Sequence, residues 1–310
     1  MDHLGTKILV DGGDPRETQQ VKERLGFVDG QTTNPSLIAK NPRIQQRLAA
    51  GHKLTQSEEL NAYKEIVREI APLVRDAGVS IEVFADARTT AEQMAAQGKE
   101  MFAWIPNAYI KYPSTAEGLR AAQLSVRDGL RVNLTLCFSQ QQAAAVYAAT
   151  QGSRTPAYVS PFVGRLDDIG KNGMDLVRNI QSMLQRSDGH VLVLAASIRS
   201  VEQLLYCLSS KVDLVTAPAK ILLSWADQGL PRPEANYEYR SPGQPIPYEE
   251  LDLAQPWERF NIGHELTTQG LQKFAEDYRK TWPNRRVEHT EGAWLCFPLK
   301  KSTPTRKRSP

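Results

Sequence analysis

The feature that most constrains the fold of this chain is a regular alternation between short β-type segments and helical segments. Eight segments have the β-branched and aromatic composition that favours strands. They span residues 7–11, 26–34, 79–86, 108–113, 131–138, 157–163, 190–197 and 213–218. Helix-competent sequence follows each one, and this alternation predicts a parallel sheet, because parallel neighbours are joined by crossover helices.

Start and stop signals mark the helices between these segments. In the longest helical segment, apolar residues recur at helical spacing: Leu60, Tyr63, Ile66, Ile70 and Leu73. Thr55 and Glu58 fit a capping box at its start, and Gly78 fits its end. Ser114 and Ser200 predict the starts of two later helices in the same way.

Eight strand–helix units over about 225 residues match a (β/α)8 barrel, which typically needs about 250. A doubly wound open sheet is the alternative. That fold predicts a glycine-rich phosphate-binding loop after an early strand. The segment DGGDPRE at 11–17 fits neither the GxGxxG pattern nor the P-loop pattern. We therefore expect an α/β fold, a single-domain TIM barrel, with its core in residues 1–230.

The C-terminal part of the chain has a different composition. Six prolines within 231–257 predict a loop excursion without regular elements. Residues 258–298 are expected to form a helix and an extension packed on the barrel. The helix has one apolar face, formed by Leu271, Phe274, Ala275 and Tyr278. The basic segment 299–310 is expected to be a disordered, solvated tail.

Composition excludes several classes of protein. A net charge of +3 with 24% charged residues favours no polyanionic partner, so we expect no nucleic acid binding. The chain contains no 18-residue apolar run, and the apolar run near its start is too short for a secretory signal, so no membrane association is expected. The three cysteines are far apart and odd in number, which favours a reduced, cytoplasmic protein.

Polar residues occur where the expected strands end, which is where barrel enzymes place their active sites. The set comprises Asp11, Asp14, Thr32, Thr33, Asn34, Glu82, Lys111, Asn133, Thr135, Ser160, Arg165, Ser197, Arg199, Thr216 and Lys220. Small polar residues at alternate strand positions point to one face and leave space there. Contributions of this kind from six strands predict a pocket.

The residue types in this pocket indicate a chemistry. A lysine in a barrel core loses hydration, and its neutral amine can attack a ketone to form a Schiff base. A carboxylate can move the substrate's hydroxyl proton, and two arginines suit a phosphate. The five histidines lie away from the strand ends, so we expect no metal and no cofactor. The set predicts a class I aldolase for a phosphorylated sugar.

Each of these residues also has a purely structural interpretation. Lys111 can be a surface residue whose stem packs along the strand. Glu82 can be its partner in a structural ion pair, and Arg199 can pair with a surface carboxylate. These alternatives stay open for each residue taken alone.

Five stretches together resemble the transaldolase family. They are DGQTTNPSLI (29–38), IKYPSTAEGLRAA (110–122), NLTLCFSQQQA (133–143), SPFVGRLDD (160–168) and AASIRS (195–200). They fall on the second, fourth, fifth, sixth and seventh expected strands, in the family's order. The resemblance extends from about residue 7 to residue 220 and implies the same barrel and the same Schiff-base chemistry.

The resemblance implies roles for individual residues. Lys111 resembles the Schiff-base lysine, and Asp11 resembles the aspartate that exchanges the C4 hydroxyl proton. Glu82 and Thr135 resemble the pair that holds and activates water. The groups implied to orient the dihydroxyacetone unit are Asn34, Asn133 and Ser160. The set implied to bind phosphate is Arg165, Ser197 and Arg199, and Phe162 matches an aromatic wall position.

Two activities occur in this family. Transaldolases pass the three-carbon unit to an aldose phosphate, in the pentose phosphate pathway, whereas fructose-6-phosphate aldolases release dihydroxyacetone. Glu82 and Phe162 follow the transaldolase pattern, because the aldolases typically have glutamine and tyrosine there. The resemblance therefore implies a transaldolase with phosphorylated sugar substrates. A homo-oligomer is compatible with it, and a catalytically silent sugar-phosphate binding protein is the alternative from another class.

Overall fold

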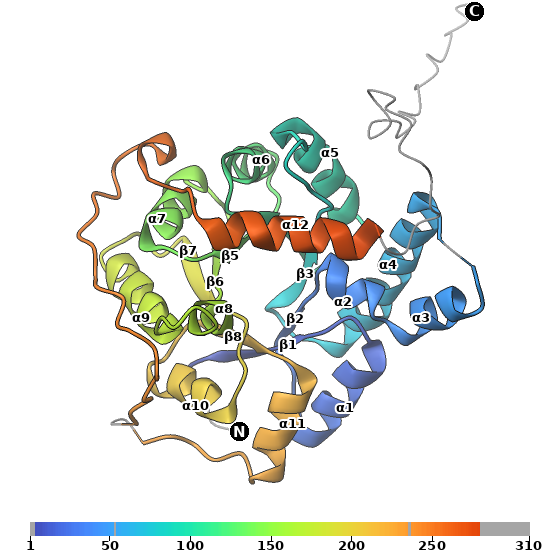
Figure 1. The fold of residues 1–310 in the computed structure, drawn as a ribbon, viewed down its shortest axis with the longest axis horizontal. Helices are drawn as coiled ribbons and strands as arrows, with labels where there is room; N and C mark the ends of the chain where they lie inside the picture. The colour runs from blue at the N-terminus through green and yellow to red at the C-terminus, as the bar shows by residue number, and fades with distance from the viewer. Residues whose placement is uncertain (1–3, 53, 235–236, 280–310) are drawn as a thin grey trace, which may run out of the picture.

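A closed barrel of eight parallel strands forms the centre of the molecule (Figure 1). The computed structural model describes residues 4–52, 54–234 and 237–279. Its strands are β1 (Lys7–Asp11), β2 (Gly30–Thr32), β3 (Gly78–Glu82), β4 (Ala108–Pro113), β5 (Val132–Cys137), β6 (Ala157–Pro161), β7 (Val191–Ala195) and β8 (Leu214–Ala217). Lys7 of β1 pairs with Leu214 of β8 and closes the ring. The expected (β/α)8 barrel is confirmed, and the open-sheet alternative is wrong.

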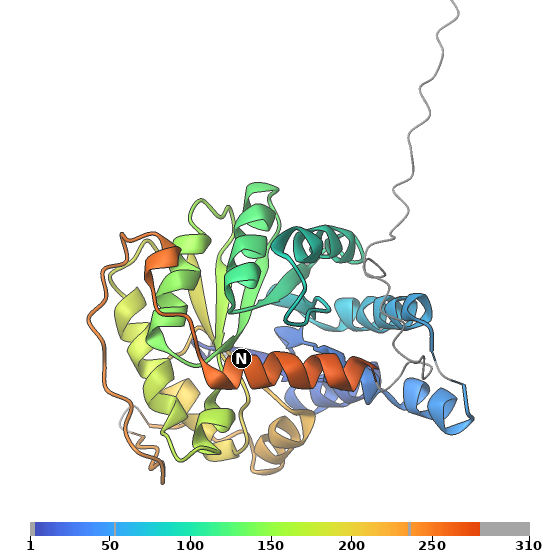
Figure 2. The same ribbon diagram turned by 45° about the horizontal axis from the view of Figure 1, so that its top comes forward.

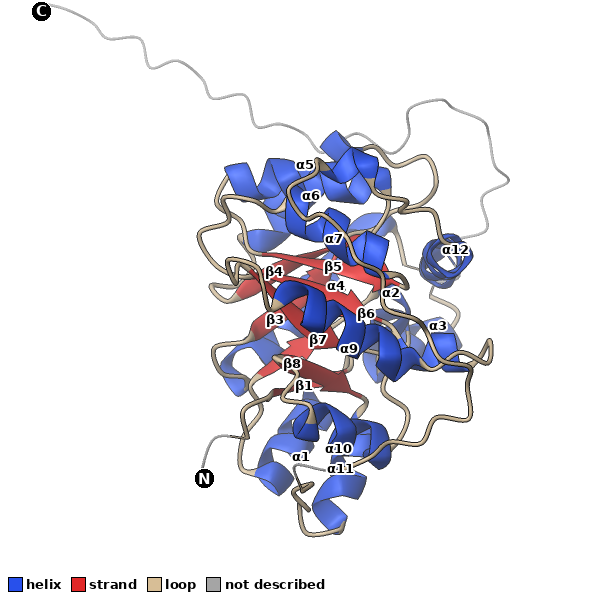
Figure 3. Ribbon diagram, turned by 90° about the vertical axis from the view of Figure 1, so that its left-hand side faces the viewer, coloured by secondary structure: helices blue, strands red, loops and turns tan. Residues whose placement is uncertain are grey.

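The helices lie around the barrel, with α12 across one end of it (Figures 1 and 3). They are α1 (Pro15–Leu25), α2 (Pro35–Ala39), α3 (Pro42–Ala49), α4 (Gln56–Ile70), α5 (Ala91–Phe102), α6 (Ala116–Arg127), α7 (Gln140–Ala149), α8 (Val163–Asp167), α9 (Gly173–Leu184), α10 (Val201–Ser209), α11 (Ala219–Asp227) and α12 (Glu265–Arg279). Short 3-10 turns occupy Ala71–Leu73 and Trp257–Arg259. None of the described helices combines the length and apolar composition that crossing a bilayer requires.

The helix signals in the sequence were correct in part. The capping box of Thr55 and Glu58 begins α4 as expected, and Ser200 caps α10. The assignment of Gly78 as a helix end is wrong, because Pro72 follows the last turn and cannot continue the helix, and Gly78 instead begins β3 with φ +70°. The start assigned to Ser114 is wrong by one residue, since the Thr115 side chain caps α6.

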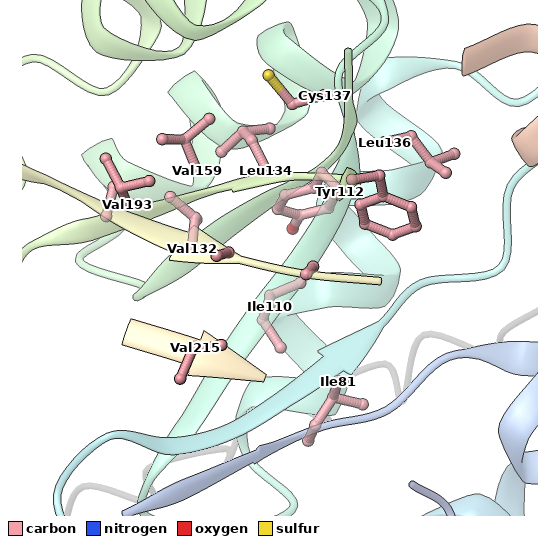
Figure 4. Packing of buried hydrophobic residues seen from close by; sticks show 14 of the residues in the cluster. Ile81, Ile110, Tyr112, Val132, Leu134, Leu136, Cys137, Val159, Val193 and Val215 are labelled. Carbon is pink, nitrogen blue, oxygen red and sulfur yellow. The ribbon is translucent and has the colours of Figure 1, made fainter. Parts of the chain in front are cut away.

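Alternate residues of each strand point to opposite sides of the sheet. The outward residues pack against the helices, and Figure 4 shows Ile81, Ile110, Val132, Val159 and Val215 in this layer. The inward residues at the N-terminal end of the barrel form an apolar plug: Leu9, Tyr109, Tyr158, Leu194 and Leu214. The inward position two residues beyond Tyr109 on β4 is Lys111. The polar residues therefore sit on top of an apolar floor.

The proline-rich segment runs along the outside of the barrel, past α10, α9 and α7 (Figures 1 and 2). Backbone hydrogen bonds join Gln244 to Gly170 and to Asn172 at 2.8 Å. Further along, Gln140 of α7 exchanges two hydrogen bonds with the backbone of Glu249. The segment leads the chain back to the C-terminal ends of the strands.

Helix α12 follows this segment and lies across that end of the barrel, where Figure 3 shows it end-on. The Thr267 hydroxyl donates to the backbone oxygen of Leu136 at 2.9 Å. At the other end of the helix, the rings of Tyr278 and Phe84 stack with centroids 3.8 Å apart. The expected extension at 280–298 and the expected tail at 299–310 lie outside the described residues.

Candidate active site

A cavity with about 530 Å³ of open space lies at the C-terminal ends of the strands, under α12. Its wall is formed by Asp11, Thr32, Asn34, Lys111, Ser160, Phe162, Arg165, Ala196, Ser197, Thr216 and Phe274. Seven of the residues to which a role was assigned from the sequence are among them: Asp11, Asn34, Lys111, Ser160, Phe162, Arg165 and Ser197. The barrel thus brings together residues that are nearly 190 positions apart in the chain.

Lys111 is a buried residue, with only 3% of its surface exposed. Its Nζ lies 3.0 Å from Glu82 Oε2, and it donates a hydrogen bond of 3.2 Å to the backbone oxygen of Thr33. Since Lys111 is buried, the surface interpretation of this lysine is wrong. The ion pair with Glu82 is present, and Lys111 is also part of the cavity wall.

Two carboxylates lie on this inner layer of the barrel. Burial raises the pKa of Glu82, and the positive charge of Lys111 opposes the increase. Burial likewise raises the pKa of Asp11, against the charge of Lys111 and a 2.8 Å hydrogen bond from the Thr32 hydroxyl. Thr32 of β2 in turn shares a 2.7 Å hydrogen bond with Thr216 of β8, on the other side of β1. Both carboxyl groups therefore hold a proton more readily than they would in water.

Neutral polar residues support one side of the cavity. The Asn133 amide donates to Ser80 Oγ at 3.0 Å, and its oxygen accepts from Ser160 Oγ at 2.7 Å. Ser160 reaches the cavity wall, whereas Asn133 is completely buried. Asn34 lines the cavity and caps α2 with its side-chain oxygen.

Thr135 lies next to this inner layer on β5, completely buried. Its hydroxyl oxygen has no hydrogen-bond partner in the part of the chain that the structure describes. A buried hydroxyl normally has a partner, so this position suits a bound water or a substrate oxygen.

The two selected arginines have different surroundings. Arg165 lines the cavity, with its guanidinium 5.7 Å from the centre of the Phe162 ring and 5.5 Å from that of Phe274. Burial lowers the pKa of Arg165. Arg199 is exposed and forms two 2.7 Å hydrogen bonds with the Asp168 carboxylate, outside the cavity wall. The structure thus places one arginine in the cavity and the other in the surface pair considered as its alternative.

Four residues of the cavity wall were given no role from the sequence. Thr32 and Thr216 belong to the strand-end set that predicts the pocket, but no individual role was assigned to them. Ala196 carries no polar signal. Phe274 was assigned to the apolar face of a helix, and the sequence contains no signal that this face covers the strand ends. Only the path of the chain through residues 231–257 determines that position.

Comparison with known proteins agrees with this geometry. Residues 8–283 match the family model for transaldolase/fructose-6-phosphate aldolase. The chain belongs to this family. A probable transaldolase of Maricaulis maris is 34% identical over 256 residues, which are 83% of this chain and 89% of the relative. One from Bartonella henselae is 33% identical over 278 residues, 90% of this chain and 99% of the relative.

A third relative, a probable transaldolase of Roseiflexus sp. (strain RS-1), is 40% identical over 197 residues, covering 64% of this chain and 79% of the relative. The family resemblance inferred from the five sequence stretches is confirmed. In the chain described here, Glu82 and Phe162 both lie at the site. Glu82 is paired with Lys111, and Phe162 is part of the cavity wall.

Proposed function

We propose that this family member is a transaldolase that moves a dihydroxyacetone unit between sugar phosphates through a Schiff base on Lys111. The donor would be fructose 6-phosphate or sedoheptulose 7-phosphate and the acceptor an aldose phosphate, in the cytoplasmic pentose phosphate pathway. The observation that carries the proposal is a buried amine 3.0 Å from a carboxylate, on a cavity that also holds Asp11 and Arg165.

Substrate binding would use the charge at one end of the cavity. Arg165 would bind the phosphate, because its guanidinium is partly desolvated and lies close to two aromatic rings. Ser197 would add a neutral donor. Arg199 would join by exchanging Asp168 for the phosphate, since both anions offer two oxygens to the guanidinium. Asn34, Asn133 and Ser160 would orient the dihydroxyacetone end.

The imine would form in two steps. Glu82 first takes a proton from the ammonium of Lys111, which the 3.0 Å separation allows. The neutral amine then adds to C2 of the ketose. One amine proton and the proton held by Glu82 pass to the C2 oxygen, which leaves as water to give the protonated imine. Thr135 would hold this water, because its buried hydroxyl oxygen is otherwise without a partner among the described residues.

Cleavage would follow at the C3–C4 bond. Asp11 takes the proton of the C4 hydroxyl, and the electrons of the bond move into the imine to give an enamine. The aldehyde leaves. An aldose phosphate then adds at C3 and receives the proton back from Asp11. Burial raises the pKa of Asp11 toward the range in which a carboxyl can both accept and return a proton. Hydrolysis of the new imine releases the product.

The experiment is an assay with fructose 6-phosphate, with and without erythrose 4-phosphate, in which the products are separated by chromatography. Sedoheptulose 7-phosphate that forms only with the acceptor supports the proposal. Free dihydroxyacetone without acceptor indicates a fructose-6-phosphate aldolase, and binding of the sugar phosphate without turnover indicates a non-catalytic binding protein.

A further inference from the structure

Tyr63 is a buried tyrosine that the proposed mechanism does not use. It lies on α4, outside the barrel, and none of its surface is exposed. Its ring is held edge-on by Phe84 and Trp104, at centroid distances of 6.0 and 5.8 Å. Its hydroxyl reaches the ends of β2 and β3. There it lies 2.5 Å from Thr33 Oγ1 and accepts a 3.0 Å hydrogen bond from the backbone N–H of Glu82.

One backbone hydrogen bond between β2 and β3 is missing at this point. The N–H of Thr33 donates to Ser80 O at 3.0 Å, which is a regular parallel rung. The next rung would join the N–H of Glu82 to the oxygen of Thr33. That oxygen instead accepts from Lys111 Nζ. Pro35, two residues beyond Thr33, has no N–H and cannot extend β2 further.

The hydroxyl of Tyr63 replaces the missing rung. Thr33 Oγ1 donates its only proton to Ser80 O at 2.8 Å, so the Tyr63 hydroxyl must be the donor to Thr33. The oxygen of Tyr63 is then free to accept the N–H of Glu82. One side-chain group thus satisfies the backbone of β3 and leaves the Thr33 carbonyl available to the lysine.

We propose that Tyr63 is a positioning residue for Lys111. It fixes the backbone of Glu82, and it releases the Thr33 carbonyl from the sheet so that both contacts of the Lys111 amine are held in place. The expected effect of Tyr63 on catalysis rests on the proposed function. Its expected effect on the position of the Lys111 amine does not.

The test compares two variants that each lose one buried tyrosine hydroxyl. In Tyr63→Phe the rung is lost. Tyr112→Phe is the matched control: Tyr112 is also fully buried, its hydroxyl binds Ser125 Oγ at 2.8 Å, and it lies in the outer layer of the barrel (Figure 4). For cleavage of fructose 6-phosphate, we expect kcat to fall about 10-fold to 100-fold in Tyr63→Phe with KM nearly unchanged, because a small displacement of the reacting groups has this effect. The control should keep the kcat of the wild type.

A second measurement needs no sugar. Acetic anhydride acylates lysine amines, and mass spectrometry gives the rate at Lys111. We expect this rate at pH 8 to be about threefold or more higher in Tyr63→Phe, because a displaced Glu82 stabilises the ammonium less. Thr33→Val should have the same effect, and the double variant should add little to either single variant, since both interrupt one chain of hydrogen bonds.

The outcomes are distinct. Equal kcat and equal Lys111 acylation in Tyr63→Phe and Tyr112→Phe would overturn the inference, whatever both variants lose in thermal stability. If the wild type does not cleave the sugar but Tyr63→Phe alone alters the acylation of Lys111, the positioning role stands and the proposed function fails.

Discussion

At the scale of single residues, the Lys111–Glu82 pair combines a favourable charge attraction with an unfavourable loss of hydration. Two opposite charges 3.0 Å apart are buried, with 4% of each side chain exposed. Desolvation of both ions offsets much of their attraction, so such a pair contributes little net stability, whereas removal of one partner is strongly destabilising. We therefore expect the pair to serve chemistry more than stability. Replacement of one partner should destabilise the fold far more than replacement of both.

The first prediction concerns this asymmetry. Lys111→Met should lower the free energy of unfolding by about 3–5 kcal/mol at pH 8, because it leaves Glu82 as an unpaired buried charge. Lys111→Met/Glu82→Gln should recover most of that loss while activity stays absent. Urea unfolding measures both. Lys99→Met, at an exposed pair with Asp128, is the control and should cost about 1 kcal/mol or less. A double variant no more stable than Lys111→Met would contradict the argument.

The second prediction concerns Asp11. Its pKa is raised in the folded protein, so the folded state binds this proton more tightly than the unfolded chain does. The charged group therefore costs stability once the pH rises above the unfolded pKa near 4. Asp11→Asn should be more stable than the wild type by about 1 kcal/mol at pH 7 and no more stable at pH 3, while its kcat falls sharply. A stability difference that is the same at both pH values would count against the burial of this carboxylate.

Residue-level prediction from the sequence succeeded where strand alternation decides the outcome. Asn133 and Thr135 are two apart and were expected on one face, and Asn133 does bond Ser80 of β3 and Ser160 of β6 inside the barrel. Arg199 shows the limit. Its partner, Asp168, is 31 residues away, and the conformation of a long exposed side chain depends on such neighbours rather than on the local sequence. Its expected place in a phosphate site stays a prediction.

At the scale of elements, α12 determines how the cavity is covered. Gly270 allows this helix to approach the barrel closely: a Cβ at this position would lie 2.6 Å from Leu136 and 2.8 Å from the Arg165 guanidinium. One turn further on, Phe274 packs over the same guanidinium. The helix therefore sets the position of the cationic group in the cavity.

The third prediction follows from this contact. Gly270→Ala should displace Arg165 and raise KM for a phosphorylated ketose about 10-fold, because one charge-assisted contact to the phosphate is weakened. KM for unphosphorylated fructose should change little. Thr268→Ala, on the exposed face of the same helix, is the control. Steady-state kinetics with both sugars measures the difference, and an equal rise in both KM values would show that Arg165 does not bind the phosphate.

Helix boundaries in the sequence were predictable where a side chain makes the cap. Thr55 begins α4 because its hydroxyl accepts the N–H of Glu58. The error at Gly78 has a different origin. Glycine suits a helix end and a strand that must adopt a positive φ equally well, and only the tertiary structure, with the oxygen of Asn107 close by, distinguishes the two.

At the scale of the whole molecule, closure of the barrel was the most predictable property. Eight β-type segments with intervening helices leave few other folds, and the parallel pairing of β1 with β8 follows once the sheet closes. The position of α12 was not predictable. Its apolar face was visible in the sequence, but the segment that carries it to the strand ends is held by separate hydrogen bonds, such as those of Gln140 with Glu249.

The central claim is that Lys111 forms the covalent intermediate. The most direct measurement is borohydride reduction of the protein in the presence of fructose 6-phosphate, followed by peptide mapping with mass spectrometry. We predict a reduced three-carbon adduct on Lys111, with none on Lys99 or Lys220. Turnover of the sugar without an adduct on Lys111, or with the adduct on another lysine, would contradict the account.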